Sequence, residues 1–288
     1  MFRTDLRYRL GMLFFLLLAS SLSADAPPQN PVPSPIELVK NAVFNEVHAA
    51  EQQHIFWTYR LSKETKSGKQ SKQMIETHDG TVARLISLND RELSPAERIS
   101  DDQRLSKLAG SREEQLRILQ DQKVELQRFL DLVRALPEAL LYEYGSTESM
   151  NGRATVRLRF RPNPRFHLTT RETLIYRTTQ GELLIDLADQ RILRLDATLT
   201  DEVNVGWGLL GHINKGGKLL LEQQRLAQGQ WRINRLNIEA TGQAFVFKSI
   251  TLRQNQFASD FQPVPENLTI PIAVQILKKT QLAEAGRP

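Results

Sequence analysis

Hydrophobic positions along the chain change their period several times, and each change predicts a change of element. Between residues 35 and about 52, apolar side chains recur every three or four positions, as on one face of an amphipathic helix. Ser34 and Pro35 suit its start, because serine caps helix N-termini and proline favours the first helical position. From residue 55 the period becomes two, which predicts half-buried strands over 55–65, 70–78 and 81–90.

A helical block interrupts these strands between residues 94 and 137. Ser94 with Glu97 and Ser111 with Glu114 each match a capping box, in which a serine and an acidic residue satisfy the free amides of a helix start. Leucines then keep one apolar face until Pro137, which we expect to end the second helix. The block is therefore predicted to be a helical insertion in a β domain.

The period of two returns after the Asn151-Gly152 pair, a strong hairpin signal. Glycine-containing pairs predict further turns at Gln180-Gly181, Gln228-Gly229 and Thr241-Gly242. Besides the strand that follows Gly152, strands are expected near 171–178, 182–187, 191–203, 218–226, 230–240 and 243–254.

About eleven strands with two or three helices predict a mainly β fold of the α+β class. A long antiparallel meander buries one of its faces most readily by curving around helices. The expected architecture is a strongly curved antiparallel sheet, or half-barrel, whose concave face is covered by the helices.

The N-terminal residues carry an export pattern. Arginines precede an unbroken apolar run from Leu10 to Ala19, and small residues follow as far as Ala26, which is the order of a secretory signal peptide. The apolar run is about half of the roughly 20 residues that a membrane-spanning helix needs. We therefore expect a cleaved signal peptide over 1–26, a proline-rich linker over 27–35, and a single domain over 36–288 in a bacterial periplasm.

The net charge and the absence of cysteine limit what the protein can bind and how it is stabilised. The chain has 288 residues and a formal net charge of +5, of which about +1 belongs to the leader. This mild charge, without a concentrated basic stripe, argues against nucleic-acid binding. The chain has no cysteine, so it carries neither a disulfide nor a lipid-bearing thiol, and its stability has to come from core burial.

Three segments resemble a known superfamily: 159–164 (Arg-Phe-Arg-Pro-Asn-Pro), the glycine-rich stretch 206–217, and 247–250 (Phe-Lys-Ser-Ile). Together with the meander and the leader, they are similar to exported bacterial proteins of the Lol-type carrier superfamily, whose carriers move outer-membrane lipoproteins across the periplasm. The resemblance implies a half-barrel that binds lipid or an acylated protein without catalysis, and it implies no cofactor. It assigns no role to any single motif.

Two patterns in the sequence bear on cofactor or metal binding. Gly206, Gly208 and Gly211 match G-x-G-x-x-G, but Gly216 and Gly217 follow too soon for the helix that a dinucleotide site needs.

The second pattern is His48, Glu51 and His54. Their spacing of three places the two histidines on different sides of a helix, so no metal site is expected. The sequence also lacks the G-x-S-x-G motif that surrounds the nucleophilic serine of α/β hydrolases. A hydrolase with a spatially assembled triad is the third-ranked function.

The leading hypothesis is a lipid- or lipoprotein-binding protein that holds acyl chains between sheet and helices. The alternative is an envelope sensor or assembly factor that uses the same fold to bind another protein, with the helices of residues 95–136 as the interaction surface. One set of apolar side chains either lines a cavity, as the first hypothesis requires, or packs as ordinary core. This set is Phe44, Val47, Trp57, Tyr59, Trp207, Leu209, Leu210 and Trp231.

Two further groups complete the candidate sites. A mobile loop carrying Trp207, Leu209 and Leu210 is expected to gate the cavity, with its freedom supplied by Gly206, Gly208, Gly211, Gly216 and Gly217. An arginine ladder of Arg157, Arg159 and Arg161 is interpreted either as a solvated outer face or as a contact for anionic headgroups during transient binding to a membrane surface.

Overall fold

A computed structural model describes residues 33–52, 55–150, 152–167, 170, 172–205, 211–244 and 248–285 of the chain. The predicted signal peptide and the linker up to residue 32 lie outside this part. So do Trp207, Leu209 and Leu210. The account that follows concerns the unit from Ser34 onward.

Four helices form where their caps and apolar spacing favour them. Capping boxes start the first two at Ser34 and Ser94, and the Ser111 side chain accepts from the amide of Glu114 at the start of the third. The helices are α1 (Pro35–Glu51), α2 (Pro95–Gly110), α3 (Arg112–Ala139) and α4 (Ile270–Ala285). Pro137 does not end α3 as expected, because the helix continues to Ala139. None of the described helices is long and apolar enough to cross a membrane.

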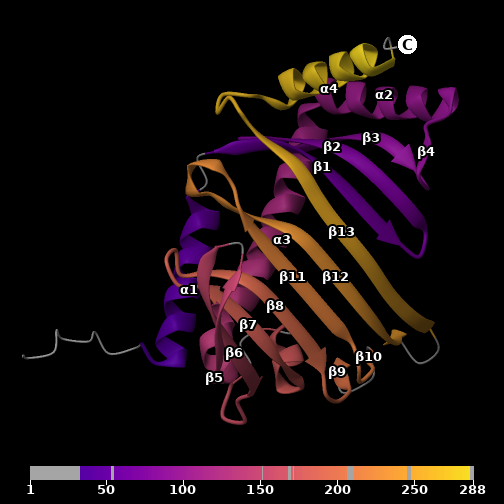
Figure 1. Ribbon diagram of the computed structural model, residues 1–288. Coiled ribbons are helices and arrows are strands. Elements are labelled where there is room, and N and C mark those ends of the chain that lie inside the picture. The colour runs from indigo at the N-terminus through magenta and orange to yellow at the C-terminus, as the bar shows by residue number, and fades with distance from the viewer. Residues whose placement is uncertain are drawn as a thin grey trace, which may run out of the picture. The chain divides into compact units, whose positions relative to one another are not determined.

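The strands form one antiparallel sheet, which confirms the mainly β class (Figure 1). They are β1 (Phe56–Thr65), β2 (Gly68–Thr77), β3 (Gly80–Leu88), β4 (Arg91–Glu92), β5 (Leu140–Met150), β6 (Arg153–Pro162), β7 (Thr179–Asp186), β8 (Arg191–Leu199), β9 (Val203–Val205), β10 (Gly211–Ile213), β11 (Lys218–Arg225), β12 (Trp231–Ala244) and β13 (Lys248–Val264). The main path runs β4-β3-β2-β1-β13-β12-β11-β8-β7-β6-β5, and β10 joins β9 to β12.

Three local predictions were wrong. Residues 172–177 form a 3-10 helix, η1, rather than a strand. Gly181 and Gly242 lie inside β7 and β12 instead of in turns. A Cβ atom at Gly181 would lie 1.9 Å from the carbonyl oxygen of Asp196, and one at Gly242 would lie 2.1 Å from that of His212. Both glycines are therefore explained by the close approach of a neighbouring strand.

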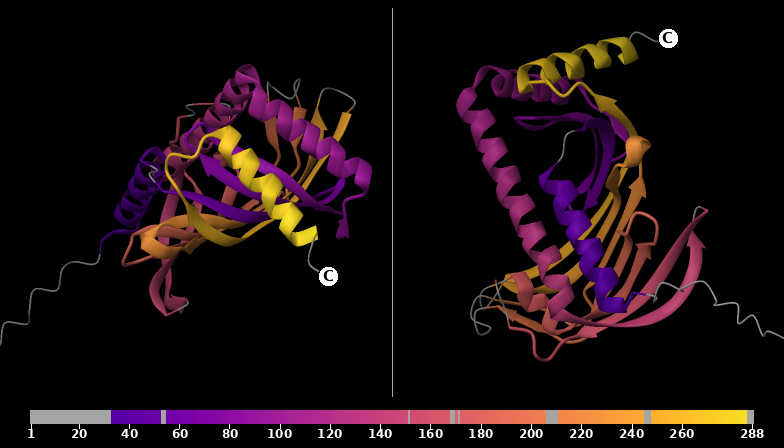
Figure 2. Two further views of the ribbon diagram at one scale, coloured as in Figure 1. Left: turned by 90° about the horizontal axis from the view of Figure 1, so that it is seen from above. Right: turned by 90° about the vertical axis from the view of Figure 1, so that its left-hand side faces the viewer.

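The inner face of the sheet is defined by rows of cross-strand partners. One row runs Leu183, Leu195, Leu221, Leu236 from β7 to β12. Helix α1 and the C-terminal half of α3 pack on this face against β5 to β8, and Val39, Val133 and Leu183 are buried in the same core cluster. Figure 2 shows α1 and α3 on the concave side.

Helices α2 and α4 pack on the opposite face. Their apolar side chains form a second core cluster with Ile75 of β2 and Val82 of β3. Trp57 and Tyr59 of β1 lie on the inner face, so Thr58 between them lies on the opposite face. Ile75 pairs with Thr58 and therefore lies on that opposite face too. The expectation that two or three helices cover the concave face is thus confirmed by α1 and α3, while α2 lies on the opposite face and α4 was not predicted.

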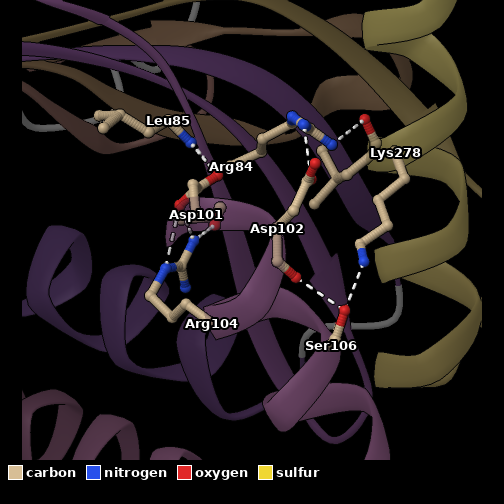
Figure 3. Close-up of polar contacts among 9 residues, drawn as sticks. Arg84, Leu85, Asp101, Asp102, Arg104, Ser106 and Lys278 are labelled. Atoms are coloured by element: carbon tan, nitrogen blue, oxygen red, sulfur yellow. Dashed lines mark hydrogen bonds and ion pairs between the residues drawn. The ribbon is translucent and has the colours of Figure 1, made fainter. Parts of the chain in front are cut away.

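Polar contacts fix α2 and α4 to β3 (Figure 3). The Arg84 guanidinium donates to the carbonyl of Leu277 at 3.1 Å and to Asp102 at 2.9 Å. Asp101 accepts from the amide of Leu85 at 3.1 Å, and Lys278 donates to Ser106 at 2.6 Å. Helices α2 and α4 are therefore held on the sheet by hydrogen bonds as well as by apolar packing.

Candidate functional site

Helix α3 crosses from one core cluster to the other and is packed only near its ends. On the side of α2, Ile118 packs on the second cluster, and the Gln122 amide exchanges two hydrogen bonds with the backbone of Thr81, at 2.9 and 3.2 Å. On the side of α1, Leu130 and Val133 are buried. Residues 123–129 between these anchors are all exposed. Figure 2 shows this span passing across the concave side of the sheet.

The exposed span keeps an apolar face toward the sheet. Leu126 lies four and seven positions before Leu130 and Val133, and Phe129 lies four positions before Val133, so all four side chains share one face of the helix. Leu126 is nevertheless 42% exposed and Phe129 38% exposed. Val124 is also exposed but lies on the opposite face of the helix. An inward apolar stripe that stays about 40% exposed is a surface that a ligand can cover.

The sheet presents a matching surface. Beside the leucine row already described, a second row runs Ala197, Leu219, Ile238 from β8 to β12. Leu195, Leu219, Leu236 and Ile238 are only partly buried. Further along the same face of β13, Leu252 and Ile250 are 45% and 44% exposed. We call these rows, with Leu126 and Phe129, the inner surface.

An aromatic group forms one end of the inner surface. Trp57 is 1% exposed and lies edge-on to Phe261 with ring centroids 6.4 Å apart, while Tyr59 stacks on the same ring at 5.0 Å. Burial raises the pKa of Tyr59. Within the described chain, the indole N–H of Trp57 and the Nε–H of Arg232 are buried without a hydrogen-bond acceptor. Two buried donors without acceptors suit a polar ligand group or water.

The other cavity candidates lie in different places. Val47 packs against the cluster of α1 and α3. Phe44 is 66% exposed and stacks on His48. Trp231 packs with Leu184 and Leu193 in a small cluster on the outer face. Of the candidates within the described residues, Val47, Trp57 and Tyr59 therefore lie on the concave side.

The predicted gating loop lies partly outside the described residues, Gly206 and Gly208 included. Gly211 belongs to β10, and Gly216, with φ +86°, forms the turn before β11. A Cβ atom at Gly217 would lie 2.9 Å from Leu199. Next to this turn is a surface hollow of about 440 Å³, lined in part by Gly216, Gly217, Ala240 and Leu252. The gating role itself stays a prediction.

The arginine ladder lies on the outer face and is largely paired. Arg157 contacts both Glu148 and Glu182, and Arg161 lies 3.8 Å from Glu143. Arg159 is exposed. The hydrogen bonds with Glu182 and Glu148 raise the pKa of Arg157. These contacts agree with the interpretation of the ladder as a solvated face, and its binding to anionic headgroups stays a prediction.

Sequence reasoning missed the exposed stripe of this site and one helix of the fold. The leucines of α3 were predicted to keep one apolar face, but their even spacing gives no sign that this face is exposed over residues 123–129. Helix α4 was not predicted, although Ile270, Val274 and Leu277 recur at helical spacing. Within the described residues, no three His, Asp or Glu side chains gather as metal ligands, and His54 lies outside them.

Comparison with known proteins gives structural matches only. No family model matches the chain, and no curated protein matches it. A domain named for outer membrane lipoprotein sorting, from Vibrio parahaemolyticus, is 12% identical, with a TM-score of 0.33, over 83% of this chain and 99% of its own. A LolA superfamily protein from Nitrosomonas europaea is 10% identical, with a TM-score of 0.28, over 81% of this chain and 96% of its own.

A third match is a DUF1329 family protein from Desulfovibrio piger, which is 11% identical, with a TM-score of 0.31, over 80% of this chain and 94% of its own. All three matches have TM-scores below 0.5. At these TM-scores they carry no argument about the site, which rests on the residues described above.

Proposed function

We propose that this chain is an exported, non-enzymatic protein that binds lipid or the acyl chains of a lipoprotein between α3 and the concave face of its sheet. The observation that carries the proposal is the inward stripe of Leu126 and Phe129, exposed between two separate core clusters. An acyl chain lying there would be stabilised by about 0.8 kcal/mol for each buried methylene. Export is proposed from the signal-peptide pattern of residues 1–26.

The direct test is to extract the protein from its native compartment and identify any co-purifying lipid by mass spectrometry. Binding is then measured with a fluorescent long-chain fatty acid. We expect Leu126→Ser with Phe129→Ser to weaken the affinity at least about tenfold, because each substitution removes apolar contact area. Val124→Ser is the matched control, since this residue is equally exposed but faces away from the sheet.

Equal affinities of the double variant and the control would contradict the proposed site. Absence of both co-purifying lipid and probe binding in the wild type would contradict the proposed function. Melting temperatures of all variants need to be compared, and the exposure of both side chains predicts small changes.

A second candidate function is binding of another envelope protein through α2 and α3. Ile99 on α2 and Leu116 near the start of α3 are 57% and 49% exposed, more than Leu126 or Phe129. If this surface binds a partner, Ile99→Ser with Leu116→Ser abolishes capture of that partner by crosslinking in cells and leaves fatty-acid binding unchanged. The two functions are therefore distinguished by which pair of substitutions has an effect.

A further inference from the structure

The two rows of the inner surface change from apolar to polar as they cross the sheet. The first row continues from Leu236 to Gln256 of β13, Lys63 of β1 and Gln70 of β2. The second continues from Ile238 to Gln254 and Thr65. Neither continuation contains a carboxylate. Donor-rich side chains thus adjoin the leucine rows on the same face of the same sheet.

Among the described residues on the inner face of β1 and β2, the only cationic side chains are Lys63 and Lys72. Lys63 pairs across the sheet with Gln70, and Lys72 pairs with Leu61, which places the two lysines as diagonal neighbours on the inner face. Both side chains are partly buried. Neither makes an ion pair with an acidic residue described by the structure, whereas the nearby Lys69 pairs with Asp90 at 2.6 Å.

The charges around Lys72 are mostly positive. Burial lowers the pKa of Lys72, and the charges of Arg104 and Lys63 lower it further, while Asp101 opposes them. Asp101 is itself engaged by Arg104 at 2.7 Å and by the amide of Leu85 at 3.1 Å. A partly buried amine next to other cations is stabilised by an anion, and the described chain supplies Lys72 with no ion-pair partner.

We propose that Lys63 and Lys72, with the amides of Gln256 and Gln70, bind the phosphate group of an anionic amphiphile whose chains cover the leucine rows. The proposal rests on the acyl-binding function proposed above and adds its headgroup chemistry. Each ammonium group supplies three donors without an acceptor, and each glutamine amide supplies two further donors, so four adjacent side chains can surround an anionic group. The same chemistry would also bind free inorganic phosphate.

The test compares two fluorescent probes with the same acyl chain, a lysophosphatidic acid and an uncharged monoacylglycerol. The variant is Lys63→Met with Lys72→Met, which keeps the apolar stems, and Lys63→Gln with Lys72→Gln serves as a second variant if the first does not fold. Arg60→Met is the control, because Arg60 lies on β1 but on the outer face. Inorganic phosphate is titrated separately and followed by the NMR signals of the lysine methylenes next to Nζ.

We expect the double variant to lose about tenfold in affinity for the lysophosphatidic acid and to bind the monoacylglycerol as the wild type does. Arg60→Met should leave both affinities unchanged. If the double variant lowers both affinities equally, or neither, the headgroup site is overturned while acyl binding stands.

If the wild type binds neither probe, the acyl-binding function fails, and the phosphate titration decides the anion site. Shifts of the Lys63 and Lys72 signals that vanish in the double variant would then support a site for free phosphate. Their absence would overturn it.

Discussion

The guanidinium of Arg191 and the carboxylate of Glu46 form a two-point ion pair, with Nε to Oε1 at 2.9 Å and Nη2 to Oε2 at 2.7 Å. Both side chains are 11% exposed, and Glu46 also accepts from the amide of Ile192 at 3.0 Å. The pair joins α1 to the start of β8 across 145 positions of sequence. It holds α1 on the concave side of the sheet.

Removing one partner of this pair should destabilise the fold strongly. Glu46→Ala leaves the Arg191 guanidinium and the Ile192 amide without their acceptor, and we expect a loss of about 3 kcal/mol in the free energy of unfolding, measured by urea denaturation. Glu51→Ala is the control, because Glu51 pairs with Arg134 at an exposed position and should cost less than about 1 kcal/mol. Similar losses in the two variants would mean that the buried pair contributes no more to the free energy of unfolding than the exposed pair does.

The packed face of α1 gives a second prediction. Val43 is buried in the core cluster of α1 and α3, so Val43→Asp should cost several kcal/mol by placing an unpaired charge there. Lys40→Asp, on an exposed position of the same helix, should change the melting temperature little. Val43→Asp should therefore lower the melting temperature much more than Lys40→Asp does. Equal melting temperatures of the two variants would contradict this orientation of α1.

Acid should weaken the contact between β6 and β7. Burial raises the pKa of Asp186, but hydrogen bonds from Arg153 at 2.8 Å and from the amide of Asp189 at 2.7 Å outweigh burial and lower the pKa below its ordinary value. A lowered pKa in the folded state stabilises the fold above the unfolded value, about 3.9, and this stabilisation is lost as the pH falls through the folded value. Below about pH 4, the unfolding free energy of the wild type should fall more steeply than that of Asp186→Asn. Equal slopes would contradict the role of this carboxylate.

Export predicts a processed N-terminus. The two small-residue pairs, Ser21 with Ser23 and Ala24 with Ala26, place cleavage between about Ser23 and Ala26. Intact-mass measurement of protein taken from the periplasm should give a chain that starts in this window. A full-length chain that carries Met1 would contradict the prediction.

The loop hypothesis gives the last prediction. Leu209→Ser with Leu210→Ser should weaken binding of the fluorescent fatty acid far more than it lowers the melting temperature, if these side chains close over a bound chain. If they instead pack as core, the substitutions should cost a few kcal/mol of stability. Unchanged binding in the molecules that remain folded would then exclude a gate.

The helices α1, α2 and α3 could be predicted because their signals are local. Ser34 and Ser94 cap the helices that follow them, and Pro35 and Pro95 occupy first helical positions. Most strands could be predicted from their period of two. Residues 172–177 were mistaken for a strand, because a short apolar run has no period long enough to separate the two structures.

What could not be predicted is which face of each element points inward. Trp57 and Trp231 both lie in alternating segments, yet Trp57 is on the inner face and Trp231 on the outer. The face depends on the register between strands far apart in sequence, and β1 pairs with β13, about 200 residues later. For the same reason, Gly181 and Gly242 look like turn residues in the sequence, although neighbouring strands explain them in the fold.

The exposed span of α3 also limits how much of the helix a ligand can contact between the two anchors. Seven residues, 123–129, separate the anchors at Gln122 and Leu130, and at about 1.5 Å per residue they measure roughly 10 Å. Under the proposed function, α3 therefore contacts only a short stretch of an acyl chain, and the leucine rows of the sheet supply the rest of the apolar contact.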